Sequence, residues 1–106
     1  MIKIPKHLSA DSRKWFKTVI DTYELDPHHV HVLTLAAESL DRANEARKRI
    51  DEHGMVYQDK AGQPKARPEV IIERDCKDLF RRLLRELNLS EEPAENRPPG
   101  LKFGGK

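Results

Sequence analysis

The stretch that decides the fold is DPHHVHVLTLAAESLDRANEARKRIDEHG, residues 26–54. Asp26 followed by Pro27 is a strong helix start, because aspartate caps a helix end and proline fits its first position. Gly54 suits the residue that ends a helix, because glycine readily adopts a positive φ. The pattern therefore predicts one long helix over residues 27–53. Every third or fourth position along it is Val30, Leu33, Ala37, Leu40, Ala43 or Asn44, Arg47 and Ile50, a mostly apolar stripe that Val32, Leu35, Ala36 and Ala46 widen in places.

Two further helices are predicted on either side of this one. Ser9 can cap a helix over residues 9–24, and Pro68 fits the first position of a helix over residues 68–88. The earlier helix has one apolar stripe, whereas the later one has two, which is more than a single partner helix can cover. The first stripe contains Trp15, Phe16, Val19, Ile20 and Tyr23, and the other two contain Val70, Ile72, Cys76, Leu79, Leu83 and Leu87, and Ile71, Phe80 and Leu84.

Residues 54–66, GMVYQDKAGQPKA, differ in character from the helices. A strand-like run is followed by turn residues and by Pro64, which confines a returning strand to an edge, so we expect a hairpin-like loop. The fold class is mainly α: a helix, a long helix, this loop and a third helix, with the two later helices forming an antiparallel hairpin that oligomerises. One domain covers residues 9–90, between an irregular lead-in over residues 1–8 and a flexible tail over residues 91–106.

The composition restricts the class of protein. The chain has 106 residues, of which 37% are hydrophobic and only 6% are aromatic, a thin supply for a core. We therefore expect another copy or a partner to complete the burial of apolar surface. We expect no membrane span and no secretory signal, and the single cysteine, Cys76, excludes a disulfide framework.

Charge is distributed in blocks behind a formal net charge of +2. Residues 1–17 carry a net charge of +4 and residues 65–85 one of +3, separated by an acidic block over residues 18–31. Two basic blocks are compatible with an anionic partner such as DNA. The alternative is that these charges form ordinary solvated helix faces.

No residue pattern indicates catalysis. His28, His29 and His31 lie in one predicted helical turn, but a zinc site needs further ligands in suitable geometry, so we expect exposed or capping histidines and no metal. Cys76 falls on an apolar stripe with no recognisable base, which is typical of a packing residue. The isolated glycines form no phosphate-binding loop. We expect neither enzymatic activity nor a cofactor.

The order of several features resembles the small subunit of phage terminases over residues 8–93. They are Trp15 in the first helix, the Asp26-Pro27 junction, the alanine-containing long helix, Glu52-His53-Gly54-Met55-Val56, the loop with Gly62 and Pro64, Pro68, and Leu83-x-x-x-Leu87-x-Leu89-Ser90. One departure is Lys65-Ala66-Arg67, which stands between the loop proline and Pro68.

The resemblance implies a non-catalytic DNA-packaging subunit in the cytoplasm of the bacterial host. Its partners would be double-stranded phage DNA, further copies of itself in a ring, and the large terminase subunit, whose ATPase and nuclease it would regulate, with no membrane involved. The tail after Glu92 would engage that large subunit. From charge, we expect DNA contacts at Lys6, Arg13, Lys14, Lys17, Lys65 and Arg67. By analogy, we expect the helical hairpin to oligomerise through Leu33, Leu40, Ile50, Leu79, Leu83 and Leu87, some of them serving as core within one chain.

Two other classes of protein remain as alternatives. A small helical transcription regulator or antitoxin-like dimer would bind DNA through Arg13, Lys14 and Lys17, but the long second helix is unlike that of a helix-turn-helix. A histidine–metal enzyme would contain stoichiometric zinc bound through His28 and His31.

Overall fold

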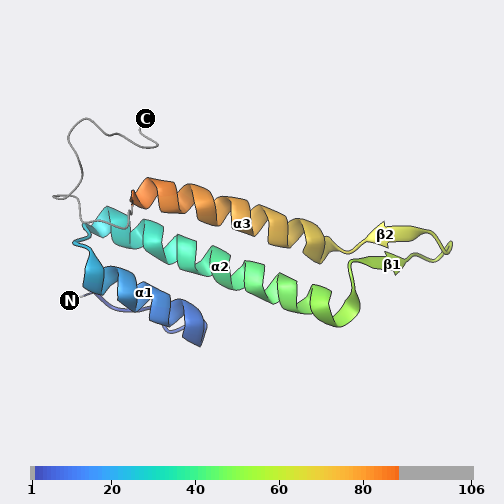
Figure 1. The fold of residues 1–106 in the computed structure, drawn as a ribbon, viewed down its shortest axis with the longest axis horizontal. Coiled ribbons are helices and arrows are strands. Elements are labelled where there is room, and N and C mark those ends of the chain that lie inside the picture. The colour runs from blue at the N-terminus through green and yellow to red at the C-terminus, as the bar shows by residue number, and fades with distance from the viewer. Residues whose placement is uncertain (1, 89–106) are drawn as a thin grey trace.

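The computed structural model describes residues 2–88 and confirms the mainly α fold. Over this range the elements are α1 (Ala10–Thr22), α2 (Pro27–His53), β1 (Val56–Gln58), β2 (Pro64–Ala66) and α3 (Pro68–Leu87). Figure 1 shows α2 and α3 running side by side in opposite directions, with α1 lying along the amino-terminal half of α2. The antiparallel β1–β2 ribbon projects beyond the helices at the turn between α2 and α3.

Each observed helix end lies within two residues of its predicted position. Asp26 accepts a hydrogen bond from the His29 backbone N–H at 2.9 Å, and Gly54 ends α2 with a φ of 85°. Helix α1 ends at Thr22 rather than at residue 24, because Tyr23 already has extended backbone angles. Helix α3 ends at Leu87, and Asn88 takes the left-handed conformation that commonly follows a helix.

The contact between α2 and α3 follows a regular spacing on both helices. The buried and half-buried residues that face the partner helix are spaced alternately four and three positions apart. This spacing is typical of two helices that pack along their length. This face of α2 is built mostly from small side chains, which allow the helices to approach closely. The two sets are Val32, Ala36, Ser39, Ala43, Ala46 and Ile50 on α2, and Glu69, Glu73, Cys76, Phe80, Leu83 and Leu87 on α3.

A second buried face of α2 holds α1. Leu33 and Ala37 on this face are fully buried in one cluster with Phe16 and Val19 of α1. The single apolar stripe predicted for the long helix therefore combines residues from two different faces. Trp15 also reaches from α1 to α3, where its ring centroid lies 5.4 Å from that of Phe80.

The lead-in completes this end of the core. Residues 2–8 form no helix, but Leu8 is buried in the cluster and Ile2 and Ile4 pack against it. The predicted tail over residues 91–106 lies outside the described residues. Among the helices of residues 2–88, none has the length and apolar character needed to cross a membrane.

Candidate nucleic-acid interface

The six basic residues predicted to contact DNA form two separate groups. Lys6 lies in the lead-in, and Arg13, Lys14 and Lys17 lie on α1, all of them exposed. Lys65 lies on β2 and Arg67 directly after it, in the ribbon at the far end of the α2–α3 hairpin (Figure 1). The six predicted cations, all of them within residues 2–88, therefore fall in two regions instead of one continuous patch.

The cationic face of α1 is a consequence of its buried face. Ser12, Phe16 and Val19 point into the protein, so the intervening Arg13 and Lys14 face solvent. The ammonium of Lys17 is 2.8 Å from the Asp21 carboxylate and is partly neutralised. Within the described residues, no carboxylate lies at ion-pair distance from Arg13 or Lys14, which leaves both positive charges available to an anion.

A polar anchor attaches the start of α1 to the middle of α2. The Asp41 carboxylate accepts hydrogen bonds from the Ser9 backbone N–H at 2.8 Å, the Ser9 hydroxyl at 2.6 Å and the Ser12 hydroxyl at 2.5 Å. Burial alone would raise the pKa of Asp41, but these serine hydrogen bonds outweigh it and the pKa lies below its ordinary value. Close by in the chain, His7 Nε2 is 2.7 Å from a Glu38 oxygen. The basic face of α1 is thus held against α2 at its first turn.

The second cationic region lies in the β1–β2 ribbon. Lys65 is paired with Tyr57 across the two strands, and the Arg67 guanidinium lies 5.9 Å from the centre of the Tyr57 ring. Arg67 is half-buried, whereas Tyr57 and Lys65 are exposed. The sequence prediction included the two cations but missed Tyr57, although the aromatic residue stands in the strand-like run that predicts the ribbon.

The leucines and isoleucine predicted for oligomer contacts differ in accessibility. Leu33, Ile50 and Leu87 are buried within the monomer, Leu40 and Leu83 are half-buried, and Leu79 is 42% exposed. The first three thus act as core residues of a single chain. Oligomer contact itself stays a prediction.

One surface of the helical hairpin carries three exposed apolar residues, of which only Leu79 was predicted as an oligomer contact. Ile72 and Leu79 are seven residues apart on α3 and both exposed, as is Leu35 on α2. Leu35 and Arg42 are also seven residues apart and share one side of α2. Because Arg42 lines a shallow hollow together with Ile72, Leu35 lies on the same side of the hairpin as Ile72 and Leu79. We call Leu35, Ile72 and Leu79 the open apolar face.

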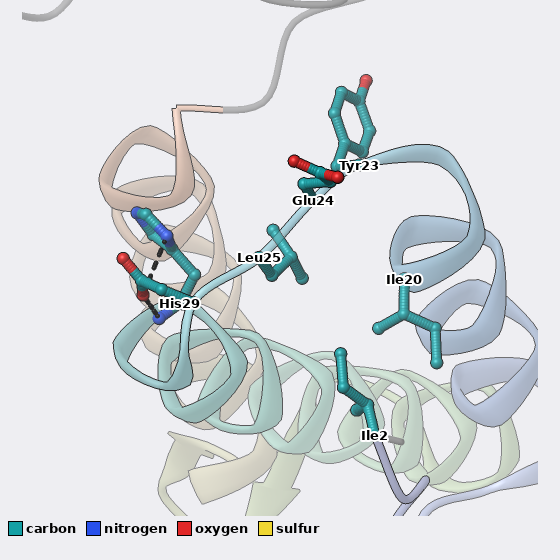
Figure 2. A pocket seen from close by; sticks show the side chains of 7 residues that line it. Ile2, Ile20, Tyr23, Glu24, Leu25 and His29 are labelled. Atoms are coloured by element: carbon teal, nitrogen blue, oxygen red, sulfur yellow. Dashed lines mark hydrogen bonds and ion pairs between the residues drawn. The ribbon is translucent and has the colours of Figure 1, made fainter.

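A second hollow lies where α1 meets α2. Figure 2 shows Ile2, Ile20 and Leu25 pointing into it, while Tyr23 points away. Its rim is acidic: Glu24 and Asp26 line it, together with His29, Tyr23 and the three apolar residues. The hydrogen bond from the His29 backbone N–H is the main cause that lowers the pKa of Asp26, which keeps the carboxylate charged. This negative rim disfavours DNA at the hollow.

The histidines considered for a metal site lie at the start of α2, far along the chain from the cysteine considered as a nucleophile. The rings of His28 and His29 lie 5.7 Å apart, and His29 Nδ1 is 3.1 Å from an Asp26 oxygen. Across residues 2–88, no group of three or more His, Cys, Asp or Glu side chains is arranged to hold a metal ion. Cys76 is half-buried in the contact between α2 and α3.

Comparison with known proteins identifies the family. A family model described as phage terminase, small subunit, matches residues 13–95, well over half of the chain. The chain belongs to this family. The match includes α2, the ribbon and α3 in full and all but the first turn of α1. Small-subunit membership gives the chain a role in phage DNA packaging, in which the terminase small subunit is generally the non-catalytic partner. Searches of curated proteins and of solved structures gave no significant match.

Proposed function

We propose that this terminase small subunit binds double-stranded phage DNA, assembles with further copies of itself into a ring, and recruits and regulates the large terminase subunit. It does so in the host cytoplasm as a non-enzymatic subunit without a cofactor. The large subunit supplies the ATPase and nuclease. The observation that carries the DNA-binding part is the cationic face of α1, which the Asp41 anchor attaches to α2.

The α1 face suits the phosphate backbone of a duplex. Arg13 and Lys14 have no competing carboxylate within the described residues, and Lys6 and Lys17 add positive charge on the same part of the chain. Cations that contact phosphates release condensed counterions, so each contact contributes an affinity that falls as salt rises. Because the anchor orders the helix before DNA arrives, little conformational entropy is lost on binding.

The DNA-binding part is tested by a salt titration of affinity for a fluorescent duplex. Arg13→Ala/Lys14→Ala is compared with a charge-matched control, Lys48→Ala/Arg74→Ala, in which both positions are exposed. We expect the α1 variant to lower the slope of log affinity against log salt by about 2, at about 0.9 per lost contact, and the control to leave it unchanged. Equal slopes for the two variants would refute this surface, and a wild-type chain that binds no duplex would refute the proposed function.

Self-assembly is proposed to use the open apolar face. Three large apolar side chains on one side of the hairpin, Leu35, Ile72 and Leu79, fit a subunit contact better than a solvated surface. The predicted contact residues Leu40 and Leu83 are half-buried and retain some accessible surface, so they can add to such a contact.

The assembly state separates the packaging subunit from the alternative regulator. We expect native mass spectrometry of the full chain to detect a ring-sized oligomer that Leu79→Glu dissociates. Ile71→Glu is the matched control, because Ile71 is 49% exposed but lies about a quarter-turn around α3 from Ile72. A wild-type chain that forms only dimers would favour the transcription-regulator or antitoxin-like alternative, and equal effects of the two variants would exclude this face as the contact.

Regulation of the large subunit is tested directly with that enzyme. We expect addition of the small subunit to change the DNA-dependent ATPase rate of the purified large subunit, and we expect α1 variants that no longer bind DNA to lose the effect. An ATPase rate that is unchanged at saturating small subunit, with no complex seen by light scattering, would refute this part.

A further inference from the structure

The β1–β2 ribbon is an ordered projection whose strand residues are all exposed. All six strand residues, Val56–Gln58 and Pro64–Ala66, are exposed to solvent. An isolated two-stranded ribbon is at best marginally stable, so local bonds must hold it in shape. At its base, the Arg67 backbone N–H donates to the Met55 carbonyl at 2.9 Å, which connects the ribbon to the start of α3.

The tip is held by a single aspartate. The Asp59 carboxylate accepts hydrogen bonds from the backbone N–H groups of Ala61 and Gln63, each at 2.9 Å, and the Asp59 N–H donates to the Gln63 carbonyl at 3.0 Å. Gly62 has a φ of 78°, a backbone conformation that favours glycine. The ribbon is therefore preorganised, and binding through it requires little ordering of the chain.

The strand register divides the ribbon into two chemically different faces. Tyr57 is paired with Lys65, and Arg67 follows two residues later, so these three side chains share one face. The short distance between the Arg67 guanidinium and the Tyr57 ring agrees with this arrangement. The opposite face carries no charge and consists of Val56, Gln58, Pro64 and Ala66.

We propose that the ribbon inserts into a groove of double-stranded DNA with its Tyr57–Lys65–Arg67 face against the nucleic acid. The inference rests on the proposed DNA binding and assigns it a second element in addition to α1. A two-stranded ribbon has the dimensions to enter the major groove of B-DNA. Lys65 and Arg67 neutralise phosphates, while the Tyr57 ring packs against sugars or base edges.

The charges of the ribbon favour DNA over an apolar protein surface as the occupant. Lys60 at the tip adds a third cation, and the one acidic residue, Asp59, has its carboxylate engaged by two backbone N–H groups. Burying two cations against an apolar protein surface would be costly, whereas phosphates compensate them. The neutral face opposite remains free when the Tyr57–Lys65–Arg67 face is occupied.

The test measures duplex affinity across a salt series for the full-length chain. Lys65→Gln is expected to lower the salt slope by about 0.9, equivalent to about eightfold weaker binding at 0.1 M salt. Tyr57→Ala is expected to weaken binding with the slope unchanged, because it removes contact area and no charge. Gln58→Ala, on the neutral face of β1, is the matched control and should change neither quantity.

Three outcomes are decisive. Wild-type binding that is weakened by Arg13→Ala/Lys14→Ala but by neither ribbon variant would overturn the ribbon inference and leave the proposed function standing. No duplex binding by the wild-type chain would overturn both. A changed oligomeric state of Lys65→Gln or Tyr57→Ala, with DNA affinity per subunit intact, would identify the ribbon as a subunit contact and overturn the inference. Circular dichroism at 222 nm verifies that the helices of each variant are formed.

Discussion

Removal of the Asp41 carboxylate should weaken the attachment of α1, which carries the proposed DNA-binding face, to α2. In the Asp41→Ala variant, the buried Ser12 hydroxyl loses its acceptor, which costs about 1–3 kcal/mol for an unpaired buried polar group. The two bonds from Ser9 are exposed, so water replaces them at about 0.5 kcal/mol each. The expected loss in the free energy of unfolding is about 2–4 kcal/mol.

Urea denaturation followed by two signals measures this loss. Ellipticity at 222 nm reports all helices, whereas fluorescence of Trp15, the single tryptophan, reports the contact of α1 with Phe80 of α3. Asp51→Ala is the control, because Asp51 is exposed and contacts only an exposed arginine at 3.1 Å within the described residues; its effect should stay within about 0.5 kcal/mol. A loss below about 0.5 kcal/mol for Asp41→Ala would refute the anchor.

The pH dependence gives a second check on the same carboxylate. The pKa of Asp41 is lowered in the folded chain. The carboxylate therefore makes its full contribution to the free energy of unfolding above the ordinary pKa of 3.8, and this contribution is lost as the pH falls through the lowered pKa of the folded chain. The stability difference between wild type and Asp41→Ala should therefore be constant from about pH 5 upward and shrink below about pH 4.

A double-mutant cycle tests the bond between Ser12 and Asp41. The double variant Ser12→Ala/Asp41→Ala should lose less free energy of unfolding than the sum of the losses of the two single variants, because no buried hydroxyl remains unpaired. Strict additivity would contradict a direct bond.

Three further changes test other parts of the fold, each by urea denaturation. Phe16→Ala should cost about 3–5 kcal/mol, because the ring is fully buried between α1 and α2; a loss under about 1 kcal/mol would contradict that burial. Gly54→Ala should cost about 1–3 kcal/mol through backbone strain alone, since its φ is 85° and its ψ 174° and no atom lies within 4 Å of the added methyl position. Glu73→Leu should be neutral or stabilising, because this carboxylate is 12% exposed in the helix contact and an apolar side chain there needs no compensating cation; destabilisation above about 2 kcal/mol would show that its ion pairs with Lys77 and Arg47 are needed.

Local residue chemistry explains why the helix boundaries were predictable from sequence. Ser9, Asp26 with Pro27, Gly54 and Pro68 each act on the backbone within a few residues, so their effect does not depend on the rest of the fold. The family could likewise be predicted, because the order of these boundary residues along the chain carries the resemblance.

The faces of α2 could not be predicted in the same way. Alanines and Ser39 are weak markers of burial, yet they form the contact with α3, while the stronger apolar residue Leu33 packs against α1. A helix with two partners has no single stripe, so its periodicity does not show which residues face which partner. The Asp41 anchor was missed for a related reason: Ser9 and Ser12 lie 32 and 29 residues away in sequence, and only the packing of α1 brings them together.

The distance along α2 between α1 and the ribbon, the two proposed DNA contacts, can be compared with the pitch of DNA. From Asp41, where α1 is anchored, to the end of α2 at His53 the helix rises about 18 Å at 1.5 Å per residue, and the ribbon adds about 10 Å at about 3.3 Å per residue. The sum of about 28 Å is close to one turn of B-DNA, about 34 Å. For both proposed contacts made to one duplex, we expect hydroxyl-radical protection by a bound subunit to recur with an interval of about one helical turn.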